Sequence, residues 1–416
     1  EQARFPRPLP AREALSVAIV GGGVAGCSAA AALRALGVGR VAVFDTGRHG
    51  VGGRLASRLA EEGSLPAAQS GKGRGVAAGD GALRFDHACQ FFSGAEPADS
   101  GDATQGSDNA NFAGAIARWE TSGAVAAMEE GAVGVISADG APRELPGPFY
   151  FGTRGMRSVA EAMLEGHEGI EVVPHCWVNR MRATDAGWEL QGEGKDRGVF
   201  DICVIAHNGK CANNLLKPSG APRTYDFFRR LKLSSTWVAL VAFHGEEVRL
   251  PGGLRAAFSS GLPSLKLAVD QGAKFGGGAN TWALLSTAEY AKSNKVPQER
   301  VSQADADKVL QDLLEDLRAM AGVDELPPVR YSFCQLWGAA LPRNALRGEA
   351  GGCTLDVESR VAACGDWIGG GASVENAWRS GQAVAEAIVG LADGRKVGDI
   401  GIDGPLVSIE AAAEAL

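Results

Sequence analysis

The chain has 416 residues, of which 45% are apolar and 22% are charged, and its formal net charge is −8. These proportions are typical of a soluble, intracellular globular protein with two or three domains. The acidic balance argues against a nucleic-acid partner, because neutralising phosphates requires a basic surface. The eight cysteines include no C-x-x-C pair, which disfavours a disulfide scaffold and a metal site and favours free thiols.

The first 15 residues form a polar, proline-containing lead-in without the pattern of a signal peptide. The chain begins with Glu1, so removal of an upstream transit peptide would favour the plastid stroma or a mitochondrion over the cytoplasm. Residues Ala14–Leu33 are uncharged and long enough to span a bilayer. Their four glycines and few large apolar side chains favour a strand, a turn and a helix, so we expect no transmembrane segment.

A buried strand, a glycine turn, a helix and a second buried strand are predicted over residues 16–45. The turn carries the pattern G-x-G-x-x-G at Gly21, Gly23 and Gly26. The first glycine permits a tight turn, the second lets a pyrophosphate approach the backbone, and the third lets helix and strand pack closely. The spacing therefore predicts a phosphate site at the start of the helix.

The residues around this turn strengthen the prediction of dinucleotide binding. Val24 and Ala25 lie at the helix start, where free N–H groups and the helix dipole favour an anion. Asp45 ends the second strand, 24 residues after Gly21, where a carboxylate can accept hydrogen bonds from a ribose, and Thr46 follows it. The alternative is an ordinary strand–helix turn, and the pattern alone does not separate NAD from FAD.

The next stretch, "GVGGRLASR" (50–58), is rich in small residues. Gly53 would let the backbone pass close to a pyrophosphate, with Arg54 available as a cation, although Arg54 could equally be a solvated loop charge. The Gly-, Ala- and Ser-rich residues 59–82 predict a flexible surface insertion, and residues 94–110 predict an acidic loop.

Further elements are predicted along the rest of the chain from period and composition. Helices are expected at 155–166, 302–322 and 373–390, and strands at 170–191 (two or three), 199–207, 234–243 and 281–286. No internal repeat is present, and the mixed composition of residues 393–416 indicates no role for this tail.

The order of these motifs resembles that of the flavin-dependent amine-oxidase superfamily, in which G-x-G-x-x-G, an acid and G-G-R follow one another. Within it, the sequence is similar to the renalase branch. "FDHACQFFS" (85–93) resembles the renalase segment under the flavin, and "FGTRGMRSVAEAML" (151–164) resembles a helix start after the substrate-domain excursion. The similarity covers most of residues 16–392, thins between 215 and 330, and implies FAD as the cofactor.

The resemblance implies an α/β fold with two discontinuous domains. One is a Rossmann-like, three-layer FAD-binding domain, and the other is an α+β substrate domain with a mixed β-sheet. The expected boundaries are 1–15 for the lead-in, 16–98, 150–215 and 331–392 for the FAD-binding domain, 99–149 and 216–330 for the substrate domain, and 393–416 for the tail.

A second group of FAD contacts is implied near the C-terminus and on one strand. Gly365 would let the chain pass the cofactor, and Asp366 would hydrogen-bond its ribityl or pyrophosphate region. The start of the closing helix would face the flavin pyrimidine edge, with contacts at Val374, Glu375 and Ala377. The backbone at Val178 would meet the adenine. The alternative for Glu375 is an acid that stabilises a first helical turn without touching a ligand. The alternative for Asp366 is a turn that only leads into the helix.

Amine oxidases of this superfamily usually keep a lysine, linked by water to flavin N5, on a substrate-domain strand. The corresponding strand, "LSSTWVALVAF", has Thr236 and Trp237 there, and Lys232 is out of register. Renalases also lack that lysine and oxidise abnormal dihydronicotinamide isomers. The resemblance therefore favours a dihydronicotinamide over an amine.

Four residues are candidates for the pocket above the flavin: Gln90, Trp237, Trp337 and Trp367. We assign catalytic roles to Gln90, Trp237 and Trp337, with Gln90 also a flavin contact. The alternative is that each tryptophan packs a core. His87 is expected to be a structural, hydrogen-bonded histidine. The chain departs from the renalase pattern at Ala88, at Asn208-Gly209 and at Gly338, which concerns the substrate more than the cofactor.

The sequence thus predicts an FAD-dependent oxidoreductase that takes a hydride from a small two-electron donor and passes electrons to O2 or another acceptor. The partner would be a small molecule, with a nicotinamide as one option. An amine, carotenoid or porphyrinogen oxidase of the same fold is the alternative enzyme. A non-catalytic subunit that retains FAD and binds protein partners is the alternative of another class.

Overall fold

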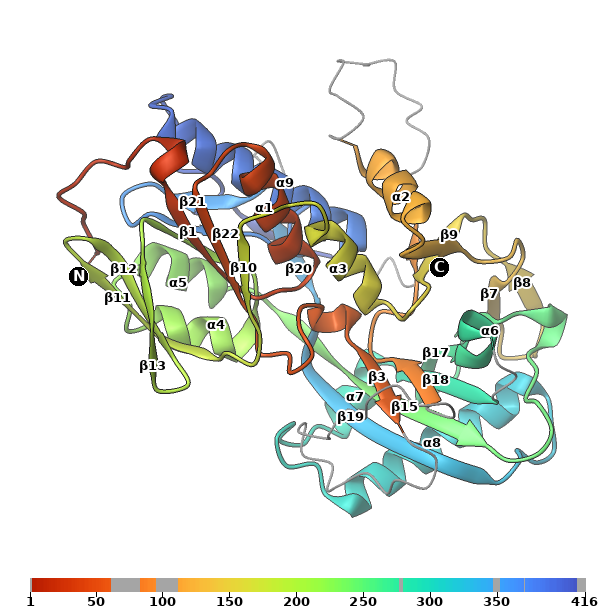
Figure 1. Ribbon diagram of the computed structural model, residues 1–416. Helices are drawn as coiled ribbons and strands as arrows, with labels where there is room; N and C mark the ends of the chain where they lie inside the picture. Colours follow the sequence, from red (N-terminus) through yellow and green to blue (C-terminus); the bar gives the residue numbers. More distant parts are fainter. Residues whose placement is uncertain are drawn as a thin grey trace.

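The computed structural model describes residues 2–60, 83–94, 111–276, 280–346, 352–369 and 371–409. Its largest units are a six-stranded and a seven-stranded sheet, which lie side by side in Figure 1. Most of the two predicted insertions, 61–82 and 95–110, lies outside the described residues.

The six-stranded sheet has the order β10-β2-β1-β14-β22-β21. Its strands are β10 (Ile170–Val173), β2 (Arg40–Phe44), β1 (Ser16–Val20), β14 (Ile202–Ile205), β22 (Val361–Ala363) and β21 (Thr354–Asp356). All neighbours are parallel except β21, which runs antiparallel to β22. The continuous apolar runs of β1 and β14 form central strands because both of their faces are covered.

This sheet is the middle layer of three. Val17 and Ile19 of β1 pack with α1 (Val24–Ala35), α3 (Arg157–Leu164) and α9 (Val374–Ala392). Ala18 and Val20 face the opposite layer. That layer contains α4 (Gly209–Leu216), α5 (Pro222–Phe228) and an antiparallel sheet of β11 (Val178–Thr184), β12 (Gly187–Gly192) and β13 (Lys195–Phe200). The Rossmann-like, three-layer expectation is therefore confirmed.

The seven-stranded sheet is mixed and has the order β19-β15-β18-β17-β16-β7-β8. Its strands are β19 (Val329–Pro342), β15 (Leu233–Phe243), β18 (Thr281–Ser286), β17 (Leu265–Asp270), β16 (Ala256–Ser259), β7 (Val133–Ile136) and β8 (Pro142–Glu144). Only the β16–β7 pair is parallel. The sheet packs one face on α7 (Ala288–Ser293) and α8 (Gln303–Ala321).

The other face of the seven-stranded sheet meets a two-stranded ribbon of β3 (Ser57–Ala60) and β4 (Leu83–Asp86). A third small sheet joins β5 (Phe92–Ser93), β9 (Phe149–Gly152) and β6 (Val125–Ala127), beside α2 (Phe112–Thr121). The segment 87–91 thus runs between the two large sheets, directly after the ribbon.

The predicted helices and strands are confirmed to within two residues at their ends, except for the strand at 199–207, which covers the end of β13 and the whole of β14. Two interpretations need correction. Residues 59–60, which the sequence placed in a flexible insertion, belong to β3 and pair with β4. The tail also contributes structure, because β23 (Leu406–Ser408) pairs with β20 (Asn344–Leu346).

All eight cysteines lie in described ranges and have free thiols. Residues Ala14–Leu33 form β1, the glycine turn and most of α1, as expected. Within the described ranges, no helix is both long and apolar enough to cross a bilayer.

Candidate functional site

The predicted binding residues lie where four neighbouring parallel strands end. Gly21 follows β1, Asp45 follows β2, and Gly365 lies two residues after β22. His207 lies two residues after β14, between them, where its Nδ1 hydrogen-bonds Val20 O at 2.9 Å. In parallel α/β sheets this carboxyl edge is the usual ligand site, most of all where neighbouring crossovers lead to opposite sides.

Each of the three glycines of the first turn is explained by a different local feature. Gly21 has φ +115°, and a Cβ there would lie 2.8 Å from Ala206 O. A Cβ on Gly26 would lie 1.9 Å from Gly21 O, so helix and strand could not pack. A Cβ on Gly23 would meet nothing within 4 Å. Gly23 therefore leaves open space over the start of α1, where the first N–H groups, including those of Val24 and Ala25, lack intrahelical partners.

Asp45 is held at the other side of the same turn. It is 7% exposed, and its Oδ2 accepts from Gly22 N at 2.7 Å while its Oδ1 accepts from Gly47 N at 2.6 Å. Thr46 beside it is exposed. The Asp45 carbonyl accepts from Cys176 N at 2.8 Å, which brings the start of β11, at Val178, to the same edge. The residues expected at the nucleoside end are thus brought together.

The second glycine turn lies directly against the first. Gly52 N donates to Gly22 O at 2.7 Å, and a Cβ on Gly53 would lie 3.3 Å from the Cα of Gly23. Gly53 also has φ +55°, in the left-handed region that favours glycine. Two backbone turns without side chains therefore border one space.

Arg54 and Asp366, expected to contact a ligand separately, bind each other. The guanidinium donates to both Asp366 oxygens at 2.7 Å and to Ala340 O at 2.7 Å. Burial lowers the pKa of Arg54, but the charge and hydrogen bonds of Asp366 outweigh it and raise the pKa overall. This two-bond ion pair, the Arg54–Asp366 fork, joins the second turn to the chain after β22. Its opposite charges cancel, so it adds no net charge beside the glycine turns.

The start of α9 completes this edge. Ser373 caps the helix by accepting from Asn376 N at 2.9 Å, and Val374 and Ala377 are buried. Glu375 pairs with Arg379 at 2.6 Å, one turn along the helix. That contact accounts for Glu375 as an acid in a first helical turn.

Helices α1 and α9 cross in close contact, as Figure 1 shows. A Cβ on Gly381 would lie 2.4 Å from Ala25 O, and Ser28 Oγ donates to Trp378 O at 2.7 Å. The start of α9 is seven residues before Gly381, or about 10 Å along the helix at 1.5 Å per residue. The two helix starts, both of which favour negative charge, thus suit an extended anionic ligand such as a dinucleotide.

Trp337 and His87 form an aromatic pair on the seven-stranded sheet side. Trp337 Nε1 donates to His87 Nδ1 at 3.2 Å, and the two rings lie 5.5 Å apart. Burial and then the Arg58 charge lower the pKa of His87 to about 3. Arg58 itself lies 3.6 Å from the centre of the Phe333 ring. His87 is therefore a neutral, hydrogen-bonded histidine, as expected.

The other candidate pocket residues lie in cores. Trp237 is fully buried on the α8 side of the large sheet, and its Nε1 donates to Asn294 O at 3.1 Å. Because side chains alternate along a strand, Thr236 points to the opposite face, where it is paired with Trp337. Trp367 packs on Phe227 with 5.2 Å between ring centres. Packing accounts for both tryptophans.

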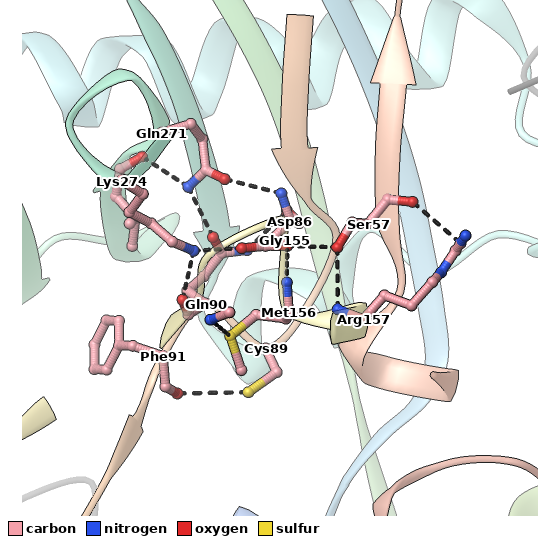
Figure 2. Close-up of polar contacts among 12 residues, drawn as sticks. Ser57, Asp86, Cys89, Gln90, Phe91, Gly155, Met156, Arg157, Gln271 and Lys274 are labelled. Atoms are coloured by element: carbon pink, nitrogen blue, oxygen red, sulfur yellow. Dashed lines mark hydrogen bonds and ion pairs between the residues drawn. The ribbon is translucent and has the colours of Figure 1, made fainter. Parts of the chain in front are cut away.

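Gln90 belongs to a buried polar cluster, which Figure 2 shows and which sequence reasoning missed. Its Nε2 donates to Asp86 O at 2.9 Å, and its Oε1 accepts from Gln271 at 2.9 Å. Lys274, on α6 (Gln271–Phe275), forms an ion pair with Asp86 and is also buried. Lys274 and Asp86 are 188 positions apart, and no local pattern in the sequence links them.

Comparison with known proteins agrees with this geometry. Residues 19–100 match the family model of the NAD(P)-binding Rossmann-like domain. A protein of Exiguobacterium sp. 255-15, assigned as a protoporphyrinogen oxidase, has a similar structure, with a TM-score of 0.60 and 12% identity over 90% of this chain and 98% of that chain.

Two structures of putrescine oxidase are also similar. A double mutant from a redesign of cofactor binding has a TM-score of 0.57 and 14% identity, covering 92% of this chain and 100% of that chain. The wild type bound to putrescine has a TM-score of 0.56 and 14% identity, covering 90% and 99%. At these identities the likeness establishes the fold.

Proposed function

We propose that this chain is an FAD-dependent oxidoreductase that accepts a hydride from a small two-electron donor of the dihydronicotinamide type. Electrons would then pass to O2 or another acceptor. The observation that carries the proposal is the contact between the two glycine turns, where Gly53 lies against Gly23 at the open start of α1. The Rossmann-like family match over residues 19–100 and the fold shared with oxidases support it.

The residues on this edge fit FAD in its extended form. The pyrophosphate would lie on the N–H groups at the start of α1, over Gly23, where a Cβ would meet no protein atom within 4 Å. Asp45 would hold the adenosine ribose, and the backbone at Val178 would meet the adenine. The Arg54–Asp366 fork would order the chain along the ribityl region, and the start of α9 would favour negative charge at the redox end.

FAD supplies a two-electron acceptor, which no protein side chain provides. The chain's own residues would place the donor and exclude water from it. Trp337 forms a planar aromatic wall, fixed by its hydrogen bond to His87 at 3.2 Å. His87 stays neutral at physiological pH because burial lowers its pKa, so it adds no charge to repel a cationic oxidised nicotinamide.

The strand that carries the N5-linked lysine in amine oxidases supports this donor class. β15 contains no lysine, and Thr236 and Val238 are the residues that it turns toward the ribbon and Trp337. The competing function is an amine or porphyrinogen oxidase. The fold shared with putrescine oxidase and with the assigned protoporphyrinogen oxidase favours it as the second candidate.

The first test is an absorption spectrum of the purified protein after incubation with FAD and removal of the excess. Bands near ~450 and ~375 nm are expected from bound oxidised flavin. Protein that shows no such bands would contradict the cofactor assignment and everything derived from it.

The second test separates the donors. Dihydronicotinamide isomers, putrescine and protoporphyrinogen are added separately and anaerobically, and loss of the ~450 nm band is followed by stopped flow. Rapid loss with a dihydronicotinamide only is the expected result. Rapid loss with putrescine or protoporphyrinogen instead would favour the second candidate, and no loss with any donor would favour a non-catalytic subunit.

A further inference from the structure

We infer that Lys274 is a positioning residue, which acts through its buried ion pair with Asp86 to hold the Gln90–Phe91 backbone beside the second glycine turn and, on the proposed function, beside the donor. Lys274 and Asp86 come from different parts of the fold. Asp86 ends β4 in the ribbon, whereas Lys274 lies on α6, directly after β17 of the seven-stranded sheet. The side chain of Asp86 is 0% exposed and that of Lys274 is 1% exposed.

Asp86 is the centre of the cluster in Figure 2. One carboxylate oxygen accepts from Ser57 Oγ at 2.7 Å and from Met156 N at 2.6 Å, while the other pairs with Lys274. Met156 is the N-cap residue of α3, and its side chain provides no cap. The carboxylate therefore takes the place of a capping side chain at a helix start, where negative charge is stabilised.

Lys274 connects this charge to the backbone of Gln90. Its ammonium group donates to Gln90 O at 2.6 Å as well as to Asp86. Gln271, one turn earlier on α6, accepts from Asp86 N at 2.8 Å and donates to Gln90 Oε1 at 2.9 Å. Both ends of the segment Asp86–Gln90 are thus bound to α6.

The segment held in this way lies beside residues already placed at the candidate site. Cys89 N donates to Arg54 O at 3.0 Å, next to the second glycine turn. Phe91, the next residue after Gln90, packs against Phe149 and Phe258, with ring centres 5.5 and 6.1 Å apart. Movement of this segment would therefore displace Phe91 and the contact of Cys89 with Arg54, while the two glycine turns keep their own contact from Gly52 N to Gly22 O.

A buried charge that loses its partner is strongly unfavourable, whereas loss of both charges is often tolerated. Lys274→Met keeps most of the length of the side chain and leaves the Asp86 carboxylate without its cation. Asp86→Asn in the same chain removes the second charge and keeps a group that can accept from Met156 N. The double variant is therefore expected to recover most of what Lys274→Met loses.

The first experiment uses the full-length protein without added FAD, and so does not rest on the proposed function. Amide hydrogen exchange is measured by mass spectrometry for wild type, Lys274→Met and Lys274→Met/Asp86→Asn. Exchange in peptides covering residues 86–91 is expected to rise at least about 100-fold in the single variant, and the melting temperature to fall by about 5–10 °C. Peptides from β1 and α1 are expected to keep their protection.

The second experiment does rest on the proposed function and uses the FAD-loaded protein. FAD affinity is expected to stay within about threefold of wild type in Lys274→Met, because the glycine turns are built from other segments. The rate of flavin reduction by the best donor is expected to fall at least about tenfold, since the wall beside the donor is displaced. The double variant is expected to regain most of this rate.

Lys308→Met is the matched control, because Lys308 also pairs with an aspartate, Asp312, but is 59% exposed. It is expected to change neither exchange nor reduction rate. Unchanged exchange at 86–91 in Lys274→Met would overturn the inference, as would an equal loss of protection throughout the molecule. A wild type that binds no FAD would contradict the proposed function and leave the exchange result to decide the inference.

Discussion

Single glycines at the first turn differ in what they are needed for. Gly21 and Gly26 are required by the fold, because a Cβ on either would meet a backbone oxygen within 2.8 Å. Gly23 is not required by the folded protein, because a Cβ there would meet nothing within 4 Å. Its backbone also has φ −78°, which any residue can adopt. The open space at Gly23 therefore points to a ligand as the reason for that glycine.

Gly23→Ala is expected to separate binding from folding. The added methyl group should leave the unfolding free energy of the apo-protein within about 0.5 kcal/mol of wild type, since the site is free of contacts. It would crowd a phosphate at the start of α1, and the affinity for FAD should fall by about 10–100-fold. Chemical unfolding and flavin titration measure the two effects. Equal FAD affinity in variant and wild type would show that no phosphate lies there.

His87 gives a prediction for pH dependence. Its pKa is about 3 in the folded protein and about 6.5 when unfolded, because burial and the Arg58 charge disfavour the proton. The unfolded chain therefore binds the extra proton between these values, so the stability contributed by neutral His87 is present above pH 6.5 and is lost as the pH falls.

His87→Gln removes that titration and keeps an acceptor for Trp337 Nε1. Between pH 7 and pH 4.5, wild type should lose about 2.5 kcal/mol more unfolding free energy than the variant. Urea unfolding at the two pH values measures the difference. Equal losses in both proteins would mean that His87 is protonated in the folded state.

At the scale of elements, the crossing of α1 and α9 sets the relation between the two helix starts. Gly381 lies at the crossing, and Gln382 Nε2 donates to Ser28 Oγ at 2.8 Å beside it. The sequence predicts both helices, α1 from its small residues and α9 from its apolar spacing. Their contact, however, depends on Gly381. The spacing of the helix starts is thus a property of packing.

Gly381→Ala is expected to force α1 and α9 apart, because its Cβ would lie 2.4 Å from the backbone oxygen of Ala25. The unfolding free energy should fall by about 1–3 kcal/mol, as for overpacked cores, and FAD affinity should fall with it. Thermal unfolding and flavin titration test this. Gly398→Ala, where a Cβ meets nothing within 4 Å, is the control and should change neither quantity. A Gly381→Ala protein as stable as the control would contradict the close crossing.

At the scale of the whole molecule, segments far apart in the chain close the Rossmann-like unit. Its sheet takes strands from the first 44 residues, from 170–205 and from 354–363. The tail is fastened to this unit by Arg223 of α5, which pairs with Asp399 at 2.5 Å and with the fully buried Asp356 at 3.5 Å. Hydrogen bonds to Asp399 and Asp403 raise the pKa of Arg223, so it stays charged.

Arg223→Met is expected to release the tail and to leave the buried Asp356 carboxylate without its cation. The unfolding free energy should fall by about 2–4 kcal/mol, and protease should cut near residue 399 sooner than in wild type. Arg229→Met is the comparison, because Arg229 pairs with Asp226 on the surface with both side chains more than 60% exposed. That variant should behave as wild type. If both variants behaved alike, the tail would not depend on Arg223.

Local sequence patterns determined the elements and the nucleotide-binding end of the site. Buried strands, the glycine turn with Asp45, and the amphipathic helices each follow from periods and turn chemistry within a few tens of residues. The three-layer unit and the role of Gly365 were expected only from the resemblance to a known family, not from these local patterns. The strands of the seven-stranded sheet were predicted only in part, because short strands such as β7 and β16 have little periodicity of their own.

Only the tertiary structure decided which side chains meet across the chain. Arg54 binds Asp366, and Asp86 binds Lys274, at separations of 312 and 188 positions, where no local period carries information. The sequence shows that Thr236 and Trp237 point to opposite faces of a strand, since the period is two. It does not show which face α8 covers, and that packing placed Trp237 in a core and Thr236 beside Trp337.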